Sequence, residues 1–189
     1  MADKEGPPNL LTEAFRRTAE ALSGSSSYTL IGGLAVAFHG LARATRDIDL
    51  LLSTPRIALP ALLEKFRERG FGFSMETVLR ELGEDHLSRI DYAGVPVDFL
   101  EATIPFFRGV VERAREEDIQ GVRMRIASPE DLVALKMIAG REDDLRDIRG
   151  ILATQGDALD LGHIRLAIAE CCEEGRAEVF ERLLAERDP

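Results

Sequence analysis

Hydrophobic and polar positions along the 189-residue chain follow two periods: alternation, typical of strands, and three-to-four spacing, typical of helices. The alternating or short apolar runs predict strands at 28–31, 46–52, 86–92, 95–100 and 122–127. Helical spacing predicts helices at 9–22, after Thr54, after Thr103, and at 129–139, 142–154, 161–172 and 177–186. Residues 71–82 fit either a short helix or a loop. The mixture of the two periods predicts an α/β (α+β) fold.

The predicted strands cluster in the first two thirds of the chain and the last third is helical. We expect an α/β core over residues 9–127 and a helical C-terminal portion, 128–189, packed on it. A chain of this length fits one compact domain. Residues 1–8 are polar and proline-rich, which predicts a disordered N-terminus.

Charge and cysteine usage narrow the classes of function. The formal net charge of −10 argues against loose, sequence-independent binding to nucleic acid, which needs a basic surface. Cys171 and Cys172 are adjacent, so no intrachain disulfide framework is expected, which favours a reducing, cytoplasmic location. No apolar run approaches the ~18 residues of a membrane span, so we expect no membrane partner.

The candidate chemistry centres on carboxylates in the predicted strands. Asp47 and Asp49 are two apart, so their side chains lie on one face and can converge on one or two hard cations. Asp98 lies on another predicted strand, between Val97 and Phe99. Three carboxylates on neighbouring strands suit two-metal phosphoryl or nucleotidyl transfer. The alternative is that these acids are solvated, Asp47 and Asp49 at a strand end and Asp98 on an edge strand.

Other residues in and after the first strand suit phosphate binding. Gly32 and Gly33 lie between a strand and a helix, where backbone N–H groups can cradle a phosphate. Arg43 precedes the two acids and is a candidate for neutralising triphosphate charge, although simple surface exposure is as consistent. Lys136 lies among apolar helical positions, so its stem can pack while its ammonium reaches a phosphate.

Two motif blocks resemble a known family. G-G-x-A-x-x-x-H-G-x-x-R-x-T-x-D-I-D, from Gly32 to Asp49, is similar to the nucleotidyltransferase-fold proteins of the AbiEii toxin type and their relatives. S-P-E-D-L-x-A-L-K-x-x-A-G-R-x-x-D-x-x-D, from Ser128 to Asp147, is similar to the second motif block of that group. The resemblance covers most of residues 28–150. It implies a nucleotidyltransferase fold, with a small mixed β-sheet flanked by helices.

The resemblance also implies site residues and partners. Asp47, Asp49 and Asp98 would be the catalytic metal triad for Mg²⁺ or Mn²⁺. The implied nucleotide-binding residues are Gly32, Gly33, Arg43, Thr45, Lys136 and Asp147. Many nucleotidyltransferases have Gly-Ser at the turn, whereas this chain has a second glycine, Gly33, which leaves that phosphate contact to backbone N–H groups.

We therefore expect transfer of a nucleoside monophosphate from an NTP to a hydroxyl of RNA, protein or a small molecule. Members of this group are often toxins of toxin–antitoxin pairs, so tRNA or protein acceptors, a cognate antitoxin and a homodimer are candidate partners. The alternative is a non-catalytic protein of this fold that binds a nucleotide or a partner chain. A D-x-D phosphatase is disfavoured because Leu51 stands where that site expects Thr or Val.

Overall fold

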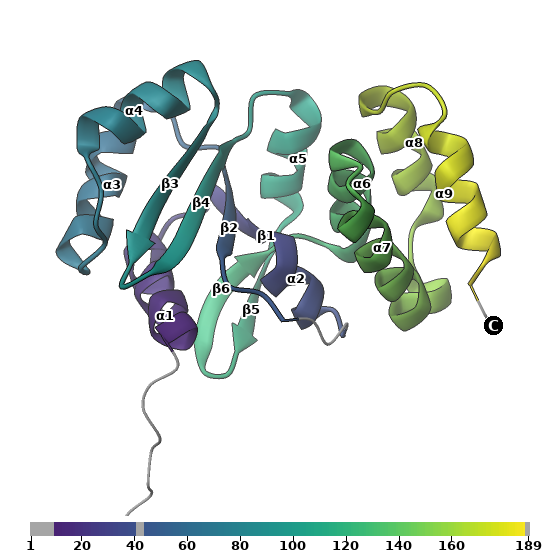
Figure 1. The fold of residues 1–189 in the computed structure, drawn as a ribbon, viewed down its shortest axis with the longest axis horizontal. Helices are drawn as coiled ribbons and strands as arrows, with labels where there is room; N and C mark the ends of the chain where they lie inside the picture. The colour runs from purple at the N-terminus through teal and green to yellow at the C-terminus, as the bar shows by residue number, and fades with distance from the viewer. Residues whose placement is uncertain (1–9, 41–43, 188–189) are drawn as a thin grey trace, which may run out of the picture.

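The computed structural model describes residues 10–40 and 44–187, and these form a mixed α/β structure (Figure 1). Its sheet has six strands in the order β3-β4-β2-β1-β6-β5. The strands are β1 (Tyr28–Ile31), β2 (Ile48–Leu52), β3 (Leu87–Tyr92), β4 (Val95–Glu101), β5 (Arg115–Ile119) and β6 (Val122–Ile126). Parallel pairs β1–β6 and β2–β4 alternate with antiparallel pairs, so the sheet is mixed.

Three groups of helices surround the sheet (Figure 1). The α-helices are α1 (Leu10–Leu22), α2 (Gly32–Phe38), α3 (Leu59–Glu68), α4 (Met75–Glu84), α5 (Pro105–Arg113), α6 (Pro129–Ala139), α7 (Glu142–Gln155), α8 (Leu161–Cys171) and α9 (Arg176–Ala185). Helix α3 contacts α1 and α4, α1 contacts strands β4 and β6, and α4 contacts β3 and β4, whereas α2 and α5 contact β1 and β2. Helices α6 to α9 pack together, and α6 contacts α2.

Alternation along β4 decides which side chains face which group of helices. Val97 and Phe99 are fully buried, and the Phe99 ring lies edge-on to Phe66 of α3 with centroids 5.2 Å apart. Asp98, between them, points to the opposite face, because successive strand residues alternate. The same alternation buries Ile48 and Leu50 of β2 and leaves Asp49 on the face of Asp98.

The strand register brings the acidic positions together. Ile31, the last residue of β1, pairs with Asp49 in the antiparallel β1–β2 ladder. Asp49 in turn pairs with Asp98 in the parallel β2–β4 ladder. Asp49 therefore lies directly between the end of β1 and the third acid, on an interior strand and beside the point where α2 begins.

Most of the predicted elements are confirmed, with two corrections. The second strand begins at Ile48 rather than residue 46, because β1 ends opposite Asp49 and the ladder with β4 extends back only to Ile48, opposite Val97. Strand β5 was not predicted, since its sequence R-E-E-D-I has no apolar face. The stretch that fitted either a helix or a loop contains helix α4.

A hydrogen bond from Gln155 Nε2 to the His39 carbonyl, 2.9 Å, joins the end of α7 to the end of α2.

No helix in residues 10–40 and 44–187 is long and apolar enough to cross a membrane. The predicted disordered segment 1–8 lies outside the described residues. The division into an α/β core and a helical portion stays a prediction.

Candidate active site

The three carboxylates singled out from the sequence converge. Asp47 lies in the connection just before β2, Asp49 is on β2 and Asp98 is on β4. One oxygen from each lies within 4.8 Å of the other two. All three side chains are partly buried. Oxygen ligands at this spacing suit a hard divalent cation, so the donor set fits Mg²⁺ or Mn²⁺.

The carboxyl of Asp49 has a raised pKa. Burial, and then the charges of Asp47 and Asp98, raise the pKa of its carboxyl to about 6. The backbone N–H of Gly33 donates a hydrogen bond to this carboxyl and Lys136 attracts it, but neither offsets the other effects. Burial and like charge therefore disfavour the ionised form of the Asp49 carboxyl, a condition that a bound cation would relieve.

The glycine turn is shaped around Asp49. Gly32 has φ +65°, a left-handed conformation, and a Cβ built on it would lie 1.8 Å from Asp49 Oδ2. Only glycine fits there, because both the backbone angle and the space exclude a side chain. The expected phosphate cradle at Gly33 thus has a second role, since its N–H already bonds Asp49.

The other two acids have neighbours that hold them. Thr45 Oγ1 donates a hydrogen bond to Asp47 Oδ1 at 2.6 Å. Arg89 of β3 donates to both oxygens of Asp98, from Nε to Oδ1 at 2.6 Å and from Nη2 to Oδ2 at 2.8 Å. This contact raises the pKa of the Arg89 guanidinium. Thr45, predicted to bind nucleotide, therefore contacts a metal-ligand candidate.

Lys136 and Asp147 belong to a buried ion-pair network. Lys136 Nζ lies 2.6 Å from Asp147 Oδ2 and 3.0 Å from Asp144 Oδ1. Asp144 also accepts hydrogen bonds from the side chain and backbone of Arg141. Burial of Asp144 opposes ionisation, but the bonds from Arg141 and Lys136 outweigh it and lower its pKa. The Lys136 ammonium is thus already bonded to two carboxylates.

A cavity of about 500 Å³ opens over this edge of the sheet. Its polar lining comprises Gly32, Asp49, Arg89, Asp98, Lys136, Arg141 and Asp144. Its apolar lining comes from β2, β3, β4, α5 and α6, and includes Leu100, Phe107 and Leu135. Asp147 is not among the residues that line the cavity. A volume of this size is within the range of small-molecule sites.

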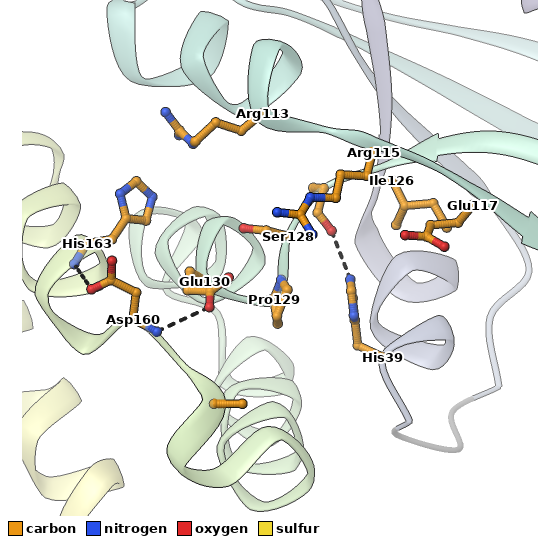
Figure 2. Close-up of a pocket in the computed structure, with 12 residues that line it drawn as sticks. His39, Arg113, Arg115, Glu117, Ile126, Ser128, Pro129, Glu130, Asp160 and His163 are labelled. Atoms are coloured by element: carbon orange, nitrogen blue, oxygen red, sulfur yellow. Dashed lines mark hydrogen bonds between the residues drawn. The ribbon is translucent and has the colours of Figure 1, made fainter.

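A second cavity, of about 740 Å³, lies beside the start of α6 and α8 (Figure 2). Two of its lining residues, Arg113 and His163, bond the fully buried Asp131, which does not itself line the cavity: Arg113 at 2.7 and 3.1 Å and His163 Nε2 at 2.9 Å. Asp160 donates its backbone N–H to Glu130 and accepts from the His163 backbone N–H. These contacts join α5, α6 and α8 to one another.

Two residues that line the smaller cavity were not predicted as site residues. Arg89 was not singled out from the sequence, although counting back from the two-residue turn of the β3–β4 hairpin places it opposite Asp98. Phe107 was recognised only as a helix residue. Arg43 lies outside the described residues.

Comparison with known proteins places this architecture in a family. Residues 11–185 match the family described as "Nucleotidyl transferase of unknown function (DUF2204)". The chain belongs to the DUF2204 family. The family confirms the coarse part of the resemblance, a nucleotidyltransferase-type protein, while a specific relation to the AbiEii toxin type stays a prediction.

Solved structures show that this DUF2204 protein has the nucleotidyltransferase fold. JHP933 from Helicobacter pylori is 14% identical, with a TM-score of 0.54 over 96% of this chain and 91% of that one. The antibiotic-resistance factor ANT(2'')-Ia is 15% identical, with a TM-score of 0.54 over 93% and 94%. A putative nucleotidyltransferase from H. pylori is 14% identical, with a TM-score of 0.53 over 95% and 93%. No curated protein matches the chain.

Proposed function

We propose that this DUF2204 protein catalyses metal-dependent transfer of a nucleoside monophosphate from an NTP to a hydroxyl group. The observation that carries the proposal is the convergence of Asp47, Asp49 and Asp98 within 4.8 Å in a chain of this family. These carboxylates would hold Mg²⁺ or Mn²⁺. When bound, such a cation polarises the phosphate oxygens and neutralises the charge that develops on them.

In the proposed reaction, the acceptor hydroxyl oxygen forms a bond to the α-phosphorus of the NTP. The bond from that phosphorus to the bridging oxygen breaks, and pyrophosphate leaves. The hydroxyl proton passes to a carboxylate of the triad. The positioning of nucleotide and acceptor supplies much of the rate, because two reactants held in line react as one molecule.

The nucleotide would lie in the 500 Å³ cavity. We propose that its phosphates lie beside the turn at Gly32 and Gly33, and that Arg43 and Thr45 contribute to binding them. Lys136 lines the cavity, so it would act on the phosphates through its charge while bonded to Asp144 and Asp147. Asp147 would then act by holding Lys136. The apolar wall around Phe107 offers a surface for the base.

The acceptor is proposed as RNA, including tRNA, a protein or a small molecule. By the resemblance to AbiEii-type proteins, the protein would be a cytoplasmic toxin with a cognate antitoxin, and a homodimer is consistent with that role. The alternative function is non-catalytic binding of a nucleotide or partner chain. The use of the Gly33 N–H by Asp49, in place of a free phosphate contact, favours that alternative.

One comparison of variants tests catalysis. The protein is incubated with Mg²⁺, each α-labelled NTP and pools of tRNA, protein or small hydroxyl compounds. Asp49→Asn removes the charge of a triad member and should reduce transfer about 10³-fold, as loss of metal stabilisation worth several kcal/mol predicts. Asp160→Asn, in the second cavity, keeps its helix-capping oxygen and should remain within about 2-fold of wild type.

The outcomes separate the two functions. Equal transfer by wild type and Asp49→Asn would contradict a catalytic role for the triad. If no chain transfers label and NTP binding does not depend on Mg²⁺, the non-catalytic alternative stands.

A further inference from the structure

Arg89 occupies a position that the proposed chemistry leaves unexplained. It lies on β3 directly opposite Asp98 of β4, and its guanidinium bonds both oxygens of that carboxylate. A two-pronged arginine–carboxylate contact of this kind fixes the orientation of both groups. One member of the metal-ligand set is thus already bonded by a cation that the protein supplies.

The burial of the two partners is unequal. The Arg89 side chain is 64% exposed, whereas that of Asp98 is 19% exposed. Arg89 therefore approaches the acids from the open side of the cavity, which it also lines. An exposed arginine exchanges its partner for water or another anion at little cost, because solvent screens its charge.

The contact is not needed to build the hairpin. Strands β3 and β4 are paired over six residue positions, from Leu87–Leu100 to Tyr92–Val95. The other hairpin, β5–β6, has a comparable exposed pair, Arg123 with Glu116, at 3.5 Å through a single nitrogen. That pair lies away from the acids, so it provides the structural reference for Arg89.

We propose that Arg89 is an internal counter-ion that holds Asp98 when the site is empty and releases it when a metal–nucleotide complex enters. The carboxyl groups alone lack positive charge, and Arg89 supplies it before the cation arrives. On release, the guanidinium lies at the cavity mouth, within reach of an incoming triphosphate. Arg89 would thus oppose binding of the free cation and favour binding of the cation with its nucleotide. The inference rests on the proposed function, because it assumes that the triad binds a metal.

The test measures metal affinity rather than turnover. Mn²⁺ binding to the full chain is followed by the EPR signal of the free ion, with and without a non-hydrolysable NTP. Without nucleotide, Arg89→Ala should bind Mn²⁺ about 10-fold more tightly than wild type, within the usual range of coupling between ligands. With nucleotide, the same variant should bind the Mn²⁺–NTP complex more weakly than wild type.

Two further variants control for charge and for folding. Arg123→Ala changes the net charge equally and removes the matching exposed hairpin pair, so its Mn²⁺ affinity should stay within about 2-fold of wild type. Arg89→Lys keeps the charge and loses the two-pronged contact, so it should fall between wild type and Arg89→Ala. Circular dichroism of all four chains checks that the fold is retained.

The outcomes distinguish failure of this inference from failure of the proposed function. If wild type binds Mn²⁺ and Arg89→Ala binds it equally or more weakly without nucleotide, Arg89 is not a competing counter-ion, while metal-dependent transfer stands. If neither chain binds Mn²⁺ with or without nucleotide, both the proposed function and the inference are wrong.

Discussion

Two buried or half-buried carboxylates, one beside each of the two cavities described above, have different charged neighbours. Beside the 740 Å³ cavity, Asp131 is bonded by the lining residues Arg113 and His163. In the 500 Å³ cavity, Asp49 has two other acids nearby, and burial with their charges raises its pKa to about 6. The charges that act most strongly on Asp49 therefore have the same sign as its own, so the charge around Asp49 is unbalanced, whereas Asp131 is bonded directly by a guanidinium.

This difference separates a structural use of acids from a chemical one. A buried carboxylate that is fully paired holds helices together, and its removal is felt in stability. A group of carboxylates short of positive charge costs stability and is retained where the chemistry needs it. Cavity volume does not make this distinction, because the paired Asp131 lies beside the larger cavity and Asp49 lines the smaller one.

The largest expected effect is on stability and concerns the buried Asp131 beside the larger cavity. Arg113→Ala removes the guanidinium from the fully buried Asp131 and leaves the His163 ring bonded to its carboxylate. We expect the free energy of unfolding to fall by about 3 kcal/mol, because a buried charge loses its main counter-ion. Urea denaturation measures this.

Arg115→Ala is the matched control for that experiment. Its side chain lines the same cavity and makes no hydrogen bond or ion pair with the described residues. Its loss should change stability by less than about 0.5 kcal/mol. Equal losses in Arg113→Ala and Arg115→Ala would contradict the structural role given to Asp131.

The next effect is on the affinity of the three aspartates for metal. Gly32→Ala would place a methyl group 1.8 Å from Asp49 Oδ2, so the carboxylate must leave its position. We expect Mn²⁺ affinity to fall by about 100-fold, the upper end of effects on ligand orientation. Isothermal titration calorimetry measures the affinity.

Gly94→Ala separates the clash from backbone strain. Gly94 also has a positive φ, +89°, but nothing lies within 4 Å of its Cβ position. Both variants should lose about 1 kcal/mol of stability or more from the left-handed backbone. Only Gly32→Ala should bind Mn²⁺ more weakly than wild type. A wild-type Mn²⁺ affinity in Gly32→Ala would contradict the close fit between Gly32 and Asp49.

The smallest effect concerns pH. Because the folded pKa of Asp49 is raised to about 6 from an ordinary 3.8, the folded state holds its proton more tightly than the unfolded state. Between pH 4 and 6 the unfolded chain binds fewer protons, so stability falls as the pH rises. Relative to Asp49→Asn, wild type should lose about 2 kcal/mol across this range.

Urea denaturation of both chains at several pH values measures that difference. Saturating Mg²⁺ should abolish it, because a cation favours the ionised carboxylate. A difference between the two chains that does not change with pH would contradict the unbalanced charge ascribed to the smaller cavity.

Local signals in the sequence predicted much of the fold. Helix α6 begins and ends where expected, because Ser128 caps its first turn and Gly140, at φ +65°, ends it. Strand β5 escaped prediction because an exposed edge strand needs no apolar face, so its charged residues gave no alternation to detect. Its existence depends on pairing with β6, which is a tertiary property.

The acidic site was predictable in part for the same reason. The two-residue spacing of Asp47 and Asp49 is a local pattern, and strand alternation then fixes the face on which Asp98 lies. The bonding of Lys136 to Asp144 and Asp147 depends on the packing of α6 against α7, which spacing along one helix does not report. Local rules along the sequence therefore identify the candidate ligands and miss their counter-ions.

Helix α2 has one further consequence, for truncation of the protein. It spans seven residues, about 10 Å. At one end the Gly33 N–H bonds Asp49. At the other, the His39 ring bonds the Ala127 carbonyl, the dashed line from His39 in Figure 2. The His39 carbonyl also accepts a hydrogen bond from Gln155 of α7. A protein cut after residue 127 would keep all three aspartates but lose the anchor from α7 and the charge of Lys136. A fragment used to study the three aspartates should therefore extend at least through Gln155, so that it keeps Lys136 and the contact between α7 and α2.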